Sequence, residues 1–181
     1  MGMTTTIDGT SGVTTPSGAI YNGIASGTAV ASTSGTSIDF TGIPSWVKRI
    51  TVMFNGVSWS STASNLRVQI GSGSVEITGY LAGFAQINSA SASGWGSTST
   101  AGFDLAFLSA ATDVVQGSIT ITNQTGNAWV SSGVVYRSGG TGAVSQSAGG
   151  KTTSGALDRL RITTSNGTDT FDAGSINILY E

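Results

Sequence analysis

The chain contains no cysteine and no histidine. It therefore cannot form a disulfide scaffold, a zinc site of thiolate or imidazole ligands, or a catalytic triad with a histidine base. Charge is scarce as well, because Lys, Arg, Asp and Glu make up 9% of the residues and leave a net charge of −2. Such a chain offers no basic surface to a phosphate backbone, so we expect no nucleic-acid binding.

Proline and long apolar runs are also rare. Two prolines in 181 residues exclude a polyproline or collagen-like chain. No apolar stretch approaches the roughly 20 residues of a transmembrane helix. The first residues, MGMTTTIDGTSG, have neither the basic nor the apolar region of a secretory signal. We therefore expect no membrane insertion and no signal peptide.

Small residues dominate what is present. Glycine, serine and threonine account for 81 of the 181 residues, yet hydrophobic residues still make up 38%. The hydrophobic residues recur with period two: Ile50, Val52 and Phe54 alternate with outward Arg49 and Thr51. The small residues suit the turns between many short strands. The sequence predicts an all-β fold, an antiparallel two-sheet sandwich of jelly-roll type.

The chain divides into two parts at the start of this periodic pattern. Residues 27–181 are predicted to form the sandwich, and residues 1–26 an extended N-terminal arm. The arm has only isolated apolar residues, which need another surface to become ordered. We therefore expect its apolar residues to contact other copies of the chain; they are Ile7, Val13, Ile20, Tyr21 and Ile24.

Within the sandwich, Val130, Val134 and Tyr136 are expected to face the core as one set. Three connections are longer than a turn requires, at 58–65, 88–100 and 138–156. Long loops in a compact domain often carry function.

Two of these loops contain tryptophan among small residues. Trp95 in SGWGS and Trp59 in VSWSS could each stack on a sugar ring or pack against another subunit. They could equally fold back over the ends of the sandwich. Asn65 and Lys151 are further candidates, Asn65 for hydroxyl groups and Lys151 for an anionic group.

Other motifs give weaker indications of chemistry. SWVK, from Ser45 to Lys48, opens a strand and lacks the partner motifs of the serine enzymes it matches. SQSAGGKT, at 145–152, is one glycine short of a phosphate-binding loop and has no helix after its lysine. Asp169 and Asp172 have spacing that suits turn capping better than calcium binding. No carboxylate pair stands out for glycoside hydrolysis, although two could converge across a sheet. We expect no enzyme activity, cofactor or metal.

Three stretches together resemble proteins of tailed bacteriophages. They are the leader TTTIDGTSGVTTPSG, the segment FTGIPSWVKRITVMFNGVS and the C-terminal ALDRLRITTSNGTDTFDAGSINILYE. The resemblance is to tail-fibre and other virion structural proteins. It implies a homotrimer and attachment to other virion proteins through the N-terminal arm. It also implies contact with the host surface, where glycan is a possible ligand, and assembly in the bacterial cytoplasm.

Two functions remain open at this point. One is a trimeric receptor-binding tip or tail fibre, which the long loops favour. The other is an architectural virion protein, such as a head decoration, head fibre or tail accessory protein, which the short chain favours.

Overall fold

The structure, a computed structural model, is built of β-strands. It describes residues 23–60, 64–89, 94–108, 110–139 and 142–181, and the strands at 6–8, 12–15 and 18–20. Every strand pair in these ranges is antiparallel, and none of these residues lies in a helix. Nowhere in the described ranges is there a helix long and apolar enough to cross a membrane. The prediction of an all-β fold is confirmed.

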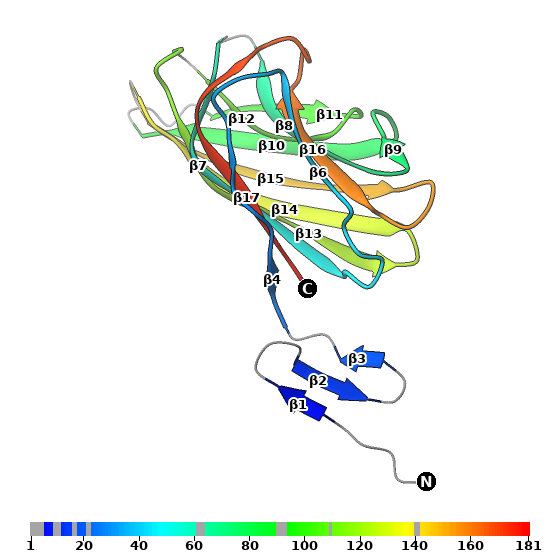
Figure 1. The fold of residues 1–181 in the computed structure, drawn as a ribbon. Helices are drawn as coiled ribbons and strands as arrows, with labels where there is room; N and C mark the ends of the chain where they lie inside the picture. Colours follow the sequence, from blue (N-terminus) through cyan, green and yellow to red (C-terminus); the bar gives the residue numbers. More distant parts are fainter. Residues whose placement is uncertain are drawn as a thin grey trace, which may run out of the picture.

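Nine strands form a large sheet (Figure 1). Their order is β11 (Gly94–Ser99), β10 (Tyr80–Asn88), β15 (Ala143–Thr152), β14 (Ala128–Arg137), β13 (Val115–Thr125), β7 (Arg49–Trp59), β17 (Phe171–Tyr180) and β4 (Ala25–Ser26), with β5 (Val30–Ala31) also paired to β17. The strands β13, β14 and β15 are consecutive in the chain and adjacent in the sheet.

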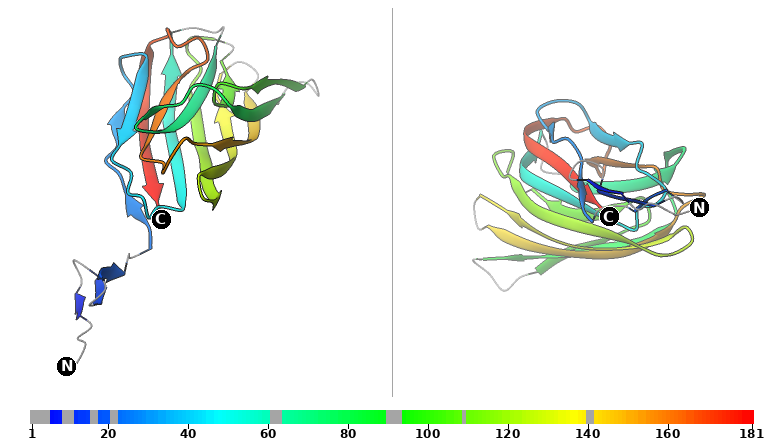
Figure 2. Two further views of the ribbon diagram at one scale, coloured as in Figure 1. Left: turned by 90° about the vertical axis from the view of Figure 1, so that its right-hand side faces the viewer. Right: turned by 60° about the horizontal axis from the view of Figure 1, so that its bottom comes forward.

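A smaller sheet of five strands packs against one face of the large sheet, and Figure 2 shows the two layers. Its order is β12 (Phe103–Phe107), β8 (Asn65–Ser72), β16 (Arg159–Thr164) and β6 (Ser37–Thr41), with β9 (Ser74–Val75) paired to β8. One hydrophobic core lies between the sheets. A face of each sheet is thereby buried, as a β-sandwich requires.

The predicted register of β7 is confirmed. Ile50 and Val52 are fully buried and Phe54 is 3% exposed, whereas Arg49 points to solvent. Thr51 is half-buried, as expected for an outward residue in a central strand. Burial of one face is what gave this strand its clear alternation.

The predicted register of β14 is wrong. Val130, Val134 and Tyr136 are 46%, 56% and 48% exposed, while Trp129 and Val135 fill the core. The register is displaced by one residue, which moves every side chain to the opposite face. Both faces of this strand carry apolar side chains, so alternation alone could not distinguish them.

Two of the predicted long loops contain strands. β11 lies within 88–100, and β15 lies within 138–156. Both strands are composed mainly of glycine, serine and alanine, which have weak intrinsic preference for β structure or none. Their pairing with β10 on both of its edges holds them in the sheet.

The N-terminal segment forms a third sheet of three short strands, β1 (Thr6–Asp8), β2 (Gly12–Thr15) and β3 (Gly18–Ile20). In the described pairings these strands bond only to one another. The sandwich pairing begins with β4, close to the predicted boundary at residue 27. The extended arm itself stays a prediction.

Candidate functional site

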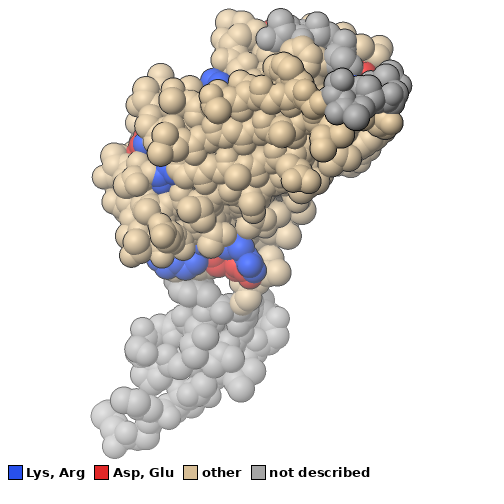
Figure 3. Space-filling view, turned by 180° about the vertical axis from the view of Figure 1, so that it is seen from behind, with Lys and Arg blue, Asp and Glu red and all other residues tan. Residues whose placement is uncertain are grey.

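The outer face of the large sheet is the most distinctive surface of the molecule. On β10, β13, β14 and β15 one set of side chains enters the core, and the alternate set points away from the small sheet. Together with the outward side of β11, these positions make up what we call the outer face. Figure 3 views the molecule from behind and shows this broad surface, with Lys, Arg, Asp and Glu confined to its borders.

This face is uncharged and contains most of the exposed apolar side chains. No outward position of β10, β11, β13, β14 or β15, strands that are described along their whole length, is Lys, Arg, Asp or Glu. The described residues include ten exposed large apolar side chains, and six of them lie here: Leu81, Ile87, Val130, Val134, Tyr136 and Val144. A surface of this composition is typical of contact with another protein.

Five of these six apolar side chains form two ridges that run across the strands, and Val134 lies in the row between them, opposite Gln146. Ile87 pairs with Val144, which pairs in turn with Tyr136, and we call this row the first ridge. Farther along the strands, Leu81 and Val130 lie on either side of Gly150 and form the second ridge. Leu81 is 81% exposed, the largest value among the described large apolar residues.

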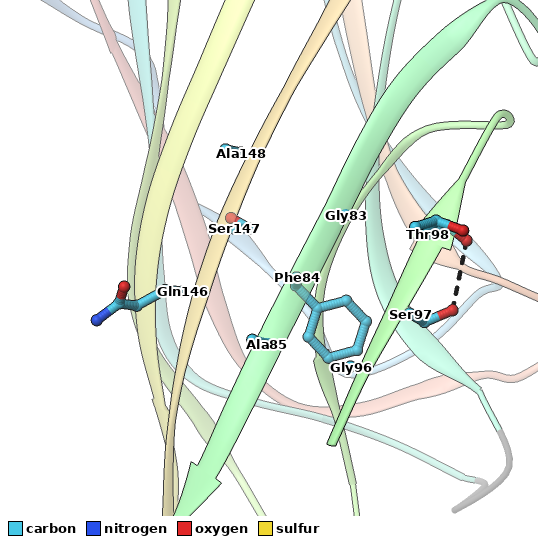
Figure 4. A pocket seen from close by; sticks show the side chains of 9 residues that line it. All are labelled: Gly83, Phe84, Ala85, Gly96, Ser97, Thr98, Gln146, Ser147 and Ala148. Atoms are coloured by element: carbon cyan, nitrogen blue, oxygen red, sulfur yellow. Dashed lines mark hydrogen bonds between the residues drawn. The ribbon is translucent and has the colours of Figure 1, made fainter. Parts of the chain in front are cut away.

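Between the ridges the face is hollowed. Small and polar outward residues of β10, β11 and β15 surround an open depression of about 830 Å³, which Figure 4 shows from close by. We call it the trough and define it by Gly83, Ala85, Gly96, Thr98, Gln146 and Ala148. A second hollow of about 360 Å³ continues it across β14 and β13 beside Ser118, Thr120 and Ser132. The two together form a shallow groove across five strands.

Close approach of two strands requires a glycine in the trough. A Cβ atom at Gly96 would lie 2.7 Å from the carbonyl oxygen of Phe84, which is closer than real Cβ atoms come. The neighbouring strand therefore leaves no room for a side chain there. The pairing of β10 with β11 therefore keeps the trough free of a side chain at Gly96.

Trp95 lies in the edge strand β11 rather than in a loop, and its ring is on the inner side of the sheet. The ring centroid is 5.3 Å from that of Phe84 and 4.9 Å from that of Phe107. Opposite it in β10 is Gln86, whose Oε1 accepts hydrogen bonds from the Phe107 backbone N–H and from Ser145 Oγ. Trp95 is nevertheless 46% exposed, so part of its indole is available to a ligand.

Asn65 lies at the same end of the sandwich as Trp95. It pairs with Phe107 in the register of β8 and β12, and Phe107 contacts Trp95. Its amide Nδ2 donates to Asp104, 3.2 Å away, so this group already serves a contact within the chain. Asn65 and Trp95 are the two predicted site residues that the fold brings near each other.

The prediction that Trp59 is displayed in a loop is wrong. It is the last residue of β7, pairs with Phe171 of β17 and is fully buried in the core. Its indole therefore has no exposed surface to present to a ligand. The strand continues two residues farther than its turn-like SWSS sequence indicates.

Lys151 lies in β15, at the opposite end of β10 from Trp95. Its Nζ is 2.6 Å from Oε2 of Glu76 and 5.5 Å from the centroid of the Tyr80 ring. Burial acts to raise the pKa of Glu76, but hydrogen bonds from Lys151 and Ser154 outweigh it and leave that pKa below its ordinary value. Burial also raises the pKa of Tyr80 above its ordinary value. This cluster ties three segments of the sandwich together.

The predicted oligomer contacts lie mostly in the N-terminal sheet. Ile7 is opposite Val13, and Val13 is opposite Ile20, so the three share one row across the strands. Ile24, just before β4, is 62% exposed. Tyr21 and the side chains of the other three lie outside the described residues.

The carboxylates of the described side chains are engaged in contacts within the chain. Six of them pair with Lys or Arg: Asp39, Glu76, Asp104, Asp113, Asp158 and Glu181. Asp169 and Asp172 accept hydrogen bonds from Ser64 and Ser58. No group of three or more metal-ligating side chains occurs among the residues searched, which are the described ones.

Comparison with known proteins gives no match to a protein-family model, to a curated protein or to a solved structure. Functional interpretation therefore depends on the chemistry of the surfaces described above.

Sequence reasoning missed the outer face. The two ridges are built from residues on neighbouring strands, so they emerge only from the register between strands. The one signal in the sequence was the absence of charge from β10, β13, β14 and β15 outside Arg137 and Lys151, both of which point inward.

Proposed function

We propose that this chain is a virion structural protein that assembles with other copies of itself through the outer face of the large sheet. The uncharged outer face, with its six exposed large apolar residues, carries this proposal. A monomer in water would leave this apolar surface uncovered, and soluble monomers rarely expose a patch of more than a few hundred Å².

The outer face is large enough for a stable interface. Strands ~4.8 Å apart and outward residues ~6.8 Å apart give five strands and four rows a flat area of roughly 650 Å². The relief of the side chains adds to this flat figure. A standard interface buries about 800 Å² on each partner, so the face approaches the size of one such interface.

The resemblance of the leader and of the first and last long strands to phage proteins supports the biological setting. In that setting the chain forms a homotrimer on the exterior of a tail or capsid. It would be assembled in the host cytoplasm, with the N-terminal segment attached to other virion proteins. The row of Ile7, Val13 and Ile20 supports a contact role for that segment. The jelly-roll topology of the sandwich remains part of this proposal. The strands β13, β14 and β15 are consecutive in the chain and adjacent in the sheet, and this arrangement does not support a jelly roll.

The contacts that the carboxylates make within the chain are consistent with assembly without catalysis. Each described carboxylate is neutralised by a cation or hydrogen-bonded by a serine. General acid catalysis by a carboxyl group would need a raised pKa, whereas the shifts found for Glu76 and Asp158 are downward.

Contact with the host surface is a second candidate function, and exposure of Trp95 is the observation that favours it. An indole that is held by Phe84 and Phe107 on one side and exposed on the other can stack on the C–H face of a sugar. Trp95 and Asn65 would act together in such a site, while Trp59 and Lys151 are held by contacts within the chain. The architectural role, without a host ligand, requires none of these residues.

Sedimentation equilibrium on the full chain tests the assembly function. We expect a mass three times that of the chain at micromolar concentration, and a stable monomer would overturn the proposal. Imaging virions with an antibody against the chain then tests the setting, because a virion component must be labelled at a fixed position.

A further inference from the structure

We infer that Leu81 of one copy packs into the trough of a neighbouring copy, so that a projecting side chain and its receiving hollow both lie on the outer face. This inference deepens the proposed function and rests on it, since it names the contact through which the copies would assemble.

Leu81 has the shape of a projecting contact residue. Its cross-strand partner on β15 is Gly150, which has no side chain to stand beside it. Its side chain is 81% exposed, more than any other large apolar side chain among the described residues. Covering this side chain removes apolar surface from water, which favours association.

The trough has the shape of a receiving site. Gly83 and Ala85 follow Leu81 at the next outward positions of β10, and Gly96 and Ala148 lie on the flanking strands. These residues leave an open volume of about 830 Å³ that is bordered by the apolar ridges. A leucine side chain fits there without displacing a charged or bulky group.

A second copy is the occupant that these observations favour. Leu81 and the trough lie side by side on one strand, so the face is complementary to itself. Neither partner carries a charge on this face, so two copies bring no like charges together. A symmetric assembly can use such a face around its axis, because each copy can insert Leu81 into one neighbour and receive the leucine of another.

Engineered cysteines test the contact cleanly, because the chain has no cysteine of its own. Leu81 and Ala85 are separated by four residues along β10, or ~13 Å, which is too far for a disulfide within one copy. The double variant Leu81→Cys/Ala85→Cys should therefore form disulfides only between copies. The single variants Leu81→Cys and Ala85→Cys serve as controls for contacts between identical positions.

A control pair away from the outer face measures random collisions. Thr41, the last residue of β6, and Thr168, in the segment that follows β16, are both exposed, and we call them the small-sheet pair. Held contacts raise the effective thiol concentration to about 1 mM, so at about 10 μM protein we expect the outer-face pair to cross-link on the order of 100-fold faster than Thr41→Cys/Thr168→Cys.

The outcomes separate this inference from the proposed function. Rapid cross-linking of the outer-face pair supports the contact. Cross-linking no faster than in the small-sheet pair, in a chain that still sediments as an oligomer, would overturn this contact and leave assembly intact. A monomeric wild-type chain would overturn both.

Discussion

Leu81 lies opposite Gly150 in the register of β10 and β15, and the glycine leaves the leucine projecting from the uncharged outer face. The pairing of β14 with β15 places Val130 on the far side of Gly150. A glycine between two exposed apolar residues is costly for a strand in isolation, because glycine weakens strands and apolar exposure is unfavourable. The arrangement is explained if another copy covers it.

Association through such a face should respond weakly to simple salt. Exposed charges are screened at high ionic strength, but the outer face has none to screen. We expect the dissociation constant to change by less than about threefold between 0.05 and 1 M sodium chloride, and sulfate to strengthen association. Sedimentation at several salt concentrations measures this. A loss of ten- to a hundredfold in affinity on adding sodium chloride would instead point to a charged interface.

The core prediction concerns Phe54 and Thr51, which lie on opposite faces of β7. Phe54 is 3% exposed in the core, so Phe54→Ala should lower the free energy of unfolding by about 3–5 kcal/mol. Thr51→Ala should cost roughly 0.5 kcal/mol or less. Chemical denaturation measures both values. Equal effects would contradict the placement of Phe54 in the core.

Acid should weaken the contact between Glu76 and Lys151. The pKa of Glu76 is lowered from its ordinary 4.5, so its ionised form is favoured in the folded state. The stability it contributes is present above pH 4.5 and is lost as the pH falls through the lower folded-state value. Asp158 shifts in the same direction, through its hydrogen bond with Arg159.

We therefore expect the unfolding free energy of the wild type to fall more steeply below pH 4.5 than that of Glu76→Gln. Both variants keep Asp158, so the difference between the two curves isolates Glu76. Parallel curves would show that the ion pair contributes nothing to stability.

The host-contact role predicts that Trp95→Ala reduces adsorption of the purified protein to host cells. Ile77→Ala is the control, because Ile77 is a 62% exposed apolar residue outside the Trp95 cluster. Loss of the ring contacts with Phe84 and Phe107 should also cost about 0.5–1.5 kcal/mol each, so folding must be checked. A folded Trp95→Ala variant that adsorbs as well as wild type would remove Trp95 from the site.

Some of this fold could be predicted from the sequence. β7 was predictable because Ile50, Val52 and Phe54 alternate with polar neighbours, and one face of the strand is fully buried. The turn between β8 and β9 also follows from local sequence, because GSGS places a glycine at Gly73, where φ is +70°.

The rest depended on contacts between distant segments. β15 has the sequence AVSQSAGGKT, whose small residues are typical of a loop. It is a strand because β10 and β14 pair with it on its two edges. In β14 both faces are apolar, because the core takes Val135 and the outer face presents Val134. Hydrophobicity alone therefore cannot decide which set of β14 residues faces the core. For the same reason the sequence did not reveal the apolar outer face.

The most direct test of the account compares two arginine substitutions by sedimentation equilibrium. Ala148→Arg places a cation in the trough, and Thr41→Arg places one on the small sheet; both side chains are exposed, so both variants should fold. Circular dichroism verifies the fold. If the outer face joins the copies, Ala148→Arg is a folded monomer while Thr41→Arg keeps the mass of the wild-type oligomer. An Ala148→Arg chain that assembles as well as the wild type would contradict the account.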